Sequence, residues 1–254
     1  MMYKDKKWLQ ENLLKYNQQE MANICGIHVG TIETYVKKYN LKGYKLETLE
    51  KANTADMTIN SPQFCYLLGL FVTDGNFSLD GRVSIQQNHK HPLEVLQKTF
   101  GGNIYHRKNS TYVYVLTQVT DIFTKLGFTQ GEKTFTVETP SELVGHKYEY
   151  LYVRGMVDGD GTISLAGKTR FFTASEKLKK YYQDFLDRNN ISYGTYPQSC
   201  GHSIECTGGF IEKTHLGIIL YQGYEDLVLP HKRERMVKII DDIVRTYEMI
   251  NHKK

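Results

Sequence analysis

Two aspartates lie in segments of the sequence that repeat each other, which is typical of a site built from two acids. Asp74 lies in LLGLFVTDG (residues 67–75), and Asp160 lies in VRGMVDGDG (residues 153–161). The match continues beyond both aspartates at one constant offset and without a gap. We therefore predict two copies of one structural unit, each of which contributes one carboxylate.

Each segment is predicted to form a short apolar helix that ends at its last glycine. Gly75 and Gly161 can adopt the left-handed conformation that ends a helix, which would place the aspartates in the last helical turns. Small residues recur four positions apart, and therefore on one helix face, in both segments: Gly69 and Thr73, Gly155 and Gly159. Because such a face carries almost no side chain, we expect the two helices to pack closely, with both aspartates at the same end of the pair.

A pair of aspartates in this position favours a bound cation. A helix C-terminus carries about half an elementary negative charge, and two neighbouring carboxylates repel each other. Neither segment contains Cys or His. Because oxygen ligands suit hard cations, we predict that Asp74 and Asp160 hold Mg²⁺, for which Mn²⁺ could substitute, rather than zinc.

The two segments resemble the signature of the LAGLIDADG homing endonucleases, and the resemblance covers roughly residues 62–254. The residues that match the motif are its glycines and its acids: Gly69, Gly75, Gly155, Gly161, Asp74 and Asp160. Two residues depart from the motif. Val72 stands where the family often has an acid, and Arg154 stands at an early position that is usually apolar.

The resemblance implies a phosphodiester hydrolase that makes a site-specific double-strand break in DNA, as in intron homing. It implies that Asp74 and Asp160 are the metal-binding catalytic acids. Lys133 and Lys232 resemble the family's basic active-site residues, although their spacing from the two aspartates differs. Because both motifs lie in one chain, a monomer is expected.

Each half, beginning with its motif helix, is predicted to have the same order of elements: helix, hairpin, helix, hairpin, helix. Asp80-Gly81 and Ala166-Gly167 are the turn signals of the first hairpin in each half. The fold class is therefore α+β, with two pseudo-symmetric αββαββα repeats at residues 62–145 and 146–254. The resemblance implies that their two four-stranded sheets form a saddle on double-stranded DNA.

Alternation along the predicted strands places polar side chains on one face of each sheet, opposite residues such as Val83 and Ile85. Arg and Gln can each make two hydrogen bonds to guanine or adenine. The candidate DNA-contacting residues are Arg82, Ser84, Gln86, Arg107, Lys108, Lys168 and Arg170. The pattern leaves open which of residues 106–108 share this face, and a merely solvated sheet surface is the alternative.

Residues 1–45 are predicted to form a separate module that resembles a helix-turn-helix. Apolar residues recur at helical spacing on both sides of Gly26, which would form the turn, and Ile32 and Val36 would anchor the second helix. Its outward side chains, available to a major groove, would be Thr31, Thr34 and Lys37. The alternative is a small helical packing or oligomerisation domain. Residues 46–61 are polar and are predicted to form a linker.

Composition is compatible with this interpretation. The formal net charge of +4 and the pI near 8.6 suit a nucleic-acid partner. The four cysteines show no paired spacing, which favours reduced thiols. No apolar run is long enough to cross a bilayer and no signal peptide is evident, so we expect no membrane partner and a cytoplasmic protein.

Two other functions fit this architecture. An intron RNA maturase would bind structured RNA, with or without DNA cleavage. A transcriptional regulator would bind DNA and cut nothing. Because a regulator does not need two metal-binding acids, the presence of both Asp74 and Asp160 favours the nuclease over the regulator.

Overall fold

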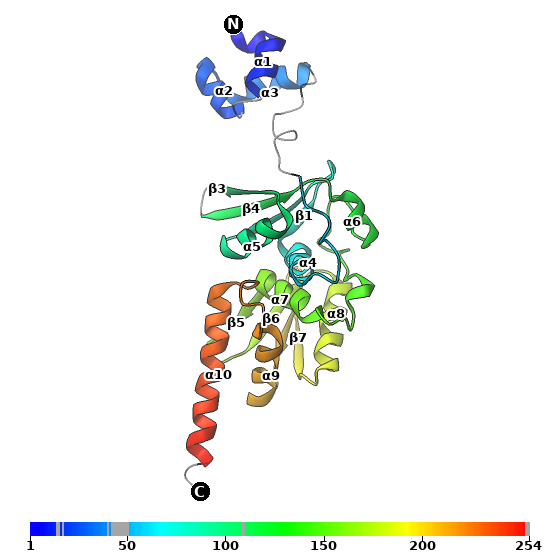
Figure 1. The fold of residues 1–254 in the computed structure, drawn as a ribbon, viewed down its shortest axis with the longest axis vertical. Helices are drawn as coiled ribbons and strands as arrows, with labels where there is room; N and C mark the ends of the chain where they lie inside the picture. The colour runs from blue at the N-terminus through cyan, green and yellow to red at the C-terminus, as the bar shows by residue number, and fades with distance from the viewer. Residues whose placement is uncertain (14–15, 17, 40, 42–50, 108–109, 252–254) are drawn as a thin grey trace. The chain divides into compact units, whose positions relative to one another are not determined.

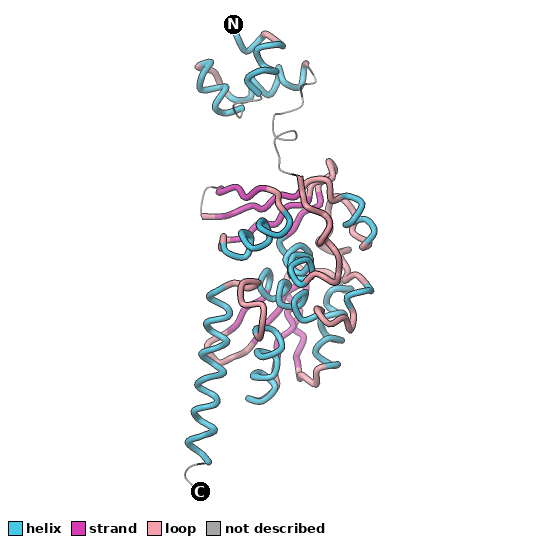
Figure 2. Tube along the Cα trace, in the orientation of Figure 1, coloured by secondary structure: helices cyan, strands magenta, loops and turns pink. Residues whose placement is uncertain are grey.

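The computed structural model describes residues 1–13, 16, 18–39, 41, 51–107 and 110–251, and it divides the chain into two compact units, Met1–Glu50 and Lys51–Lys254 (Figure 1). The described part of the first unit contains only helices (Figure 2): η1 (Met2–Lys4), α1 (Lys6–Leu13), α2 (Gln18–Cys25) and α3 (Val29–Lys38). None of the described helices of the chain is long and apolar enough to span a membrane.

The three longer helices of the first unit enclose a small apolar core of their own. Its buried side chains are Leu9, Leu13, Met21, Ala22, Ile32 and Val36. Gly26 has a φ of 64°, a left-handed conformation that favours glycine, and forms the turn between α2 and α3. The side chain of His28 then accepts a hydrogen bond from the Gly30 amide and caps the start of α3.

The second unit contains the two predicted repeats. The first comprises α4 (Pro62–Asp74), β1 (Gly75–Phe77), β2 (Val83–Gln87), α5 (His91–Phe100), β3 (Asn103–Arg107), β4 (Thr111–Leu116) and α6 (Thr120–Lys125). After η3 (Ser141–Leu143), the second comprises α7 (Glu149–Asp160), β5 (Gly161–Ile163), β6 (Thr169–Thr173), α8 (Glu176–Arg188), β7 (Tyr193–Gln198), β8 (Gly201–Cys206) and α9 (Phe210–Tyr221). The predicted α+β fold with two αββαββα repeats is confirmed, and α10 (Pro230–Asn251) follows the second repeat.

Each repeat folds into one antiparallel sheet, in the order β1-β2-β4-β3 or β5-β6-β8-β7. The two sheets share one register, since Gly75 pairs with Ile85 and Gly161 pairs with Phe171. One face of each sheet carries buried apolar side chains: Phe77, Val83, Ile85, Phe171 and Ile204. We call the opposite face the open face. It includes Ser84 and Gln86 in the first sheet and Arg170 and Phe172 in the second.

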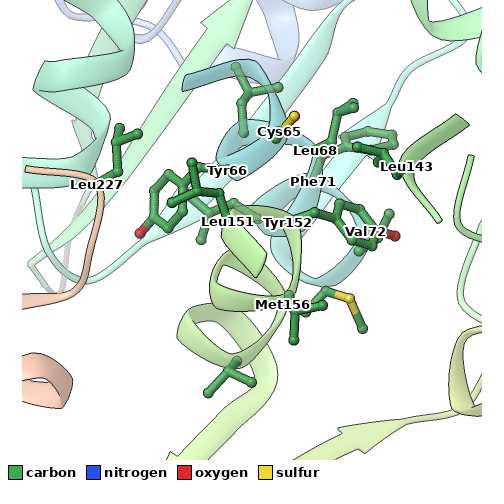
Figure 3. Packing of buried hydrophobic residues seen from close by; sticks show 14 of the residues in the cluster. Cys65, Tyr66, Leu68, Phe71, Val72, Leu143, Leu151, Tyr152, Met156 and Leu227 are labelled. Carbon is green, nitrogen blue, oxygen red and sulfur yellow. The ribbon is translucent and has the colours of Figure 1, made fainter. Parts of the chain in front are cut away.

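Helices α4 and α7 pack against each other between the two sheets (Figure 1). They are so close that only glycine fits at the crossing. A Cβ added at Gly69 would lie 2.1 Å from the Tyr152 carbonyl oxygen, and one added at Gly155 would lie 2.5 Å from the Tyr66 carbonyl oxygen. Figure 3 shows the buried side chains around this contact, among them Leu68. The predicted packing along the small-residue faces is therefore confirmed.

The expected left-handed ends of these two helices are wrong. Gly75 and Gly161 have φ values of −89° and −98°, in extended backbone. The chain passes directly from each helix into a strand, so it needs no left-handed residue there. Glycine is required for space instead, because an added Cβ would lie 2.4 Å from the carbonyl oxygen of Phe71 or of Val157.

The segment predicted as a linker, residues 46–61, is only partly described. Residues 51–61 belong to the second unit rather than to a free tether. The Asn53 amide donates a hydrogen bond to the Phe100 carbonyl (2.8 Å), and Met57 is buried in the core. The Ser61 hydroxyl accepts from the Phe64 amide and caps α4 (3.3 Å). These contacts were not predicted because the segment is mostly polar.

Replacing Gly69 with Ala tests the helix crossing. Because the new methyl group would overlap a backbone oxygen that cannot move away, we expect Gly69→Ala to destabilise the second unit by about 1–3 kcal/mol or more. Urea unfolding followed by circular dichroism measures this, since the single tryptophan, Trp8, lies in the first unit. Gly209→Ala is the control, because an added Cβ there meets nothing within 4 Å. Equal unfolding midpoints for the two variants would contradict the packing argument.

Candidate active site

Helices α4 and α7 end at Asp74 and Asp160, and their crossing brings these two residues together. Asp74 is half-buried and Asp160 is exposed. The Asp74 carboxylate lies beside the neighbouring helix, since a Cβ added at Gly159 would be 2.8 Å from Asp74 Oδ2. The two acids thus share one end of the helix pair, as the sequence predicted.

The two carboxylates carry more negative charge than this site favours. Burial, followed by the charge of Asp160, raises the pKa of Asp74 from 3.8 to about 7. Although Asp160 is partly exposed, the protein packed around its carboxyl group reduces hydration and also raises its pKa. Lys133 and Lys232 act in the opposite direction on both acids without restoring ordinary pKa values. A site of this kind is stabilised by a cation.

The two predicted lysines lie at the ends of the same helices. Lys133 Nζ donates hydrogen bonds to the Val72 and Thr73 carbonyls of α4 (2.8 and 3.3 Å). Lys232 Nζ donates to three carbonyls at the end of α7: Val157 (2.6 Å), Asp158 (2.7 Å) and Gly161 (2.6 Å). Each ammonium group satisfies carbonyls that the helix leaves unpaired and offsets the negative helix end. The structure therefore gives the lysines equivalent positions despite their unequal sequence spacing.

The environments of the two lysines differ in exposure. Lys232 is buried, whereas Lys133 is half-buried. Burial lowers the pKa of Lys133 to about 8, against the opposing effect of Asp160 and Asp74. Burial also lowers the pKa of Lys232, against the opposing effect of the neighbouring Asp158. Only the first repeat therefore presents its lysine to solvent.

Sequence reasoning missed Gln87, which contacts Asp74 directly. Gln87 is buried at the end of β2, and its Nε2 donates a hydrogen bond to Asp74 Oδ2. The equivalent position in β6 holds Thr173, whose hydroxyl accepts from the Ser175 amide (3.1 Å). The available signal was a break in alternation, because Gln87 is polar at an inward-facing position.

Sequence reasoning also missed Asp158, the other acid of the second motif, which precedes Asp160 by two residues. Its buried carboxylate accepts hydrogen bonds from the hydroxyls of Tyr66 (2.9 Å) and Tyr221 (3.1 Å) and from the Leu229 amide (2.8 Å). Burial raises the pKa of Asp158 to about 6. The carboxylate therefore connects α7 with α4, with α9 and with the segment that leads to Lys232. Val72 occupies the corresponding position of α4 and makes no such link.

Arg154, the other departure from the motif, is fully buried and anchors the segment after α9. Its guanidinium donates to five carbonyls: those of Leu220, Gln222, Gly223, Tyr224 and Leu227. Burying a charged side chain is costly unless its donors are satisfied. The residue is therefore structural, and it holds the chain on its path from α9 to α10.

Strand pairing decides which of the candidate DNA-contacting residues share the open faces. Ser84, Gln86 and Arg107 lie on the open face of the first sheet, and Arg170 lies on that of the second. His106 lies on the opposite face, with its ring 4.9 Å from that of Tyr112. Three other candidates lie outside the strands: Arg82 precedes β2 and pairs with Asp80, Lys168 precedes β6, and Lys108 lies outside the described residues.

The acid pair fits a partly hydrated cation better than a closed metal site made only of protein ligands. Within the described residues, no group of three or more His, Cys, Asp and Glu side chains is arranged to hold a metal ion. Mg²⁺ retains several water molecules and is commonly bound through one or two carboxylates together with substrate phosphates. Asp74 and Asp160 supply that number and type of ligand.

The fold is similar to that of known structures. The sequence matches no protein-family model and no curated protein. The structure is similar to that of the homing endonuclease I-WcaI bound to its DNA recognition sequence, with 14% identity, a TM-score of 0.50, and coverage of 69% of this chain and 85% of that chain. It is also similar to that of the meganuclease I-SmaMI bound to uncleavable DNA, with 16% identity, a TM-score of 0.50, and coverage of 76% of this chain and 91% of that chain.

This chain has the LAGLIDADG homing endonuclease fold. Because α4 and α7 carry the duplicated segments, they are the two LAGLIDADG helices of the fold. Asp74 and Asp160 end these helices.

The raised pKa of Asp74 predicts how the LAGLIDADG site affects stability. In the unfolded chain this carboxyl ionises near pH 3.8, whereas in the folded chain it ionises near pH 7. Above pH 7 the ionised Asp74 carboxylate therefore lowers the stability of the folded state. This loss of stability becomes smaller as the pH falls from 7 toward 3.8. Without divalent metal, Asp74→Asn should raise the melting temperature by a few degrees at pH 8 and by less at pH 5. For a chain of this size, each kcal/mol of added stability raises the melting temperature by about 2–4 °C.

Calorimetry of the parent and the variant in EDTA at the two pH values measures this difference. Asp226→Asn, at an exposed acid outside the site, is the control and should not show the same pH dependence. An equal gain from Asp74→Asn at both pH values would contradict the electrostatic argument.

Proposed function

We propose that this chain is a monomeric, site-specific DNA endonuclease that hydrolyses a phosphodiester bond in each strand in the presence of Mg²⁺. The observation that carries the proposal is the pair of aspartates at the crossing of the two LAGLIDADG helices, with a lysine at each helix end. Two proteins of similar fold, I-WcaI and I-SmaMI, have been seen bound to DNA.

Asp74 and Asp160 would hold the metal in this mechanism. Bound there, Mg²⁺ would supply Lewis-acid stabilisation of the phosphoryl oxygens and a more acidic water. The carboxylates alone would repel the phosphate, so the cation is needed for substrate to approach. Gln87 holds the Asp74 carboxylate through its hydrogen bond. Lys133 and Lys232 fix the two helix ends and reduce the negative charge that the DNA meets.

The open faces of the two sheets would contact the DNA on either side of the acids. Recognition would be distributed over strand side chains such as Ser84, Gln86 and Arg107 in the first repeat and Arg170 in the second. Arg82 and Lys168 follow the turns that lead into β2 and β6, where they could reach the phosphates. A long target follows from contacts spread in this way.

Neutralising the aspartates tests the catalytic role. We expect Asp74→Asn and Asp160→Asn each to lower the cleavage rate by at least about 100-fold, because the metal's transition-state stabilisation is lost, while DNA binding is largely kept. The measurement is a Mg²⁺-dependent cleavage selection on a randomised DNA library, with the double variant alongside. A parallel binding selection in EDTA reports recognition without cleavage.

These selections, together with a binding measurement on structured intron RNA, separate the alternatives. Cutting of one long site by the parent alone supports the endonuclease. Sequence-specific DNA binding without cutting, in Mg²⁺ or Mn²⁺, would contradict it and favour a transcriptional regulator. Tighter binding to a structured intron RNA than to duplex DNA would favour a maturase.

We further infer that the first unit is a second DNA-binding element of the helix-turn-helix kind. Its α2 and α3 are joined by the tight turn at Gly26, and α3 exposes Thr34 and Lys37, with Thr31 half-buried. A second contact in the same chain raises the affinity of the whole, because its binding becomes intramolecular.

Charge reversal at Lys37 tests this inference. In the full chain, Lys37→Glu should weaken binding to the selected target and reduce the salt dependence of binding, by a slope of about 1 if the lysine meets a phosphate. The control is Lys6→Glu, which makes the same charge change on α1. Titration by fluorescence anisotropy at several salt concentrations measures both variants. If Lys37→Glu loses no more affinity than Lys6→Glu, the first unit is better explained as a packing or oligomerisation domain. Sedimentation of the full chain would detect an oligomer.

A further inference from the structure

Glu205 lies on the open face of the second sheet, where it joins two basic side chains. It belongs to β8 and is paired with Arg170 of β6. One carboxylate oxygen accepts hydrogen bonds from Arg170 Nε (3.0 Å) and Nη2, and the other accepts from Lys168 Nζ (3.0 Å). At the equivalent place in the first sheet, Ser84 is paired with Val115, so the cluster is particular to the second repeat.

The members of this cluster differ sharply in exposure. The side chain of Glu205 is only 7% exposed, whereas those of Arg170 and Lys168 are 56% and 51% exposed. The hydrogen bonds from Arg170 and Lys168 lower the pKa of Glu205, so its carboxylate is charged. A nearly buried anion thus fixes two cations that face outward, and the three groups together carry one net positive charge.

Glu205 holds the guanidinium of Arg170 by one particular edge. The Nε and Nη2 edge faces the carboxylate. A guanidinium has five N–H donors in a rigid plane, so the edge formed by Nη1 and the second hydrogen of Nη2 still points away. That free edge presents two parallel donors, which match the O6 and N7 acceptors of guanine in the major groove. A lysine in this position would offer no such pair of fixed donors.

We propose that Arg170, positioned by Glu205, reads a guanine in the part of the DNA target that the second repeat contacts. The proposal rests on the DNA-binding function proposed above and names one determinant of its specificity. Because the fold already orders the side chain, little entropy is lost when the contact forms. Because Glu205 offsets much of the local positive charge, the cluster adds selectivity more than general affinity for phosphate. Lys168, with no planar fork, serves as a phosphate contact.

Base preference is the readout that distinguishes a base contact from a phosphate contact. The full chain and its variants would each be put through a binding selection on a randomised DNA library in EDTA, and the base frequencies at each target position compared. For Arg170→Ala we expect one position to lose its preference for guanine by at least about fivefold, the lower end for a bidentate arginine–guanine pair. Arg170→Lys should lose the same preference while retaining more affinity.

Two further variants separate the roles of Glu205 and Lys168. Glu205→Gln should weaken the preference at that same position by less than Arg170→Ala does. Lys168→Ala should weaken binding evenly and leave every base preference unchanged. Lys180→Ala is the matched control, because this lysine is also in an exposed ion pair, with Asp184, but lies on α8. It should change neither affinity nor preference.

The outcomes that overturn the proposal are separate from those that overturn the endonuclease. An even loss of affinity for Arg170→Ala, or a changed position that is not guanine, overturns the guanine contact while the parent still binds and cuts its target. A preference for cytosine that Glu205→Gln removes and Arg170→Ala leaves intact also overturns it, because Glu205 would then contact the base itself. Failure of the parent to select any DNA sequence overturns the proposed function and this inference together. Because Arg170 is exposed, its two variants test the contact even where Glu205→Gln fails to fold.

Discussion

The backbone contact between α4 and α7 at Gly69 and Gly155 determines where the candidate site lies. Because an added methyl group at either glycine would overlap a carbonyl of the opposite helix, the two axes can approach only there. Both helices end a few residues beyond this crossing, and the two aspartates are their last residues. The same contact that buries the apolar faces of the helices therefore forces two carboxylates and two negative helix ends together. The two lysines that bind those helix ends offset part of this negative charge.

The two repeats share a backbone plan but differ in the side chains at equivalent places. The first repeat has Gln87 beside its aspartate, where the second has Thr173. The second has Asp158 buried in a hydrogen-bond network, where the first has Val72. In a protein formed from two identical chains, each such change would appear in both halves. A single chain with two repeats lets each half change independently, and under the proposed function each half could adapt to its own part of an asymmetric DNA target. The Arg170 and Glu205 pair, which the first sheet lacks, is a difference of this kind.

The sequence predicted most of the fold because its signals were local or repeated. Duplication at a constant offset marked the two helices and their acids, and the glycine turns marked the hairpins. Two features depend on contacts between distant segments and were not predictable in this way. Gln87 meets Asp74 only because β2 returns beside β1. Lys133 and Lys232 reach equivalent helix ends along loops of different length. The role of Gly75 was mispredicted, because glycine suits a crowded extended residue as well as a left-handed one.

The electrostatics of the site also explain why the surrounding structure is so heavily anchored. Carboxylates with raised pKa values weaken the fold at neutral pH, where they must be charged. A helix pair that could relax would separate the acids and remove the strain. The bonds from Asp158 to Tyr66, Tyr221 and Leu229, together with the five carbonyls held by Arg154, tie α7 to α4 and to the segment before α10. These buried interactions oppose that separation. They keep the two acids close together, at a cost in stability when both carboxylates are charged.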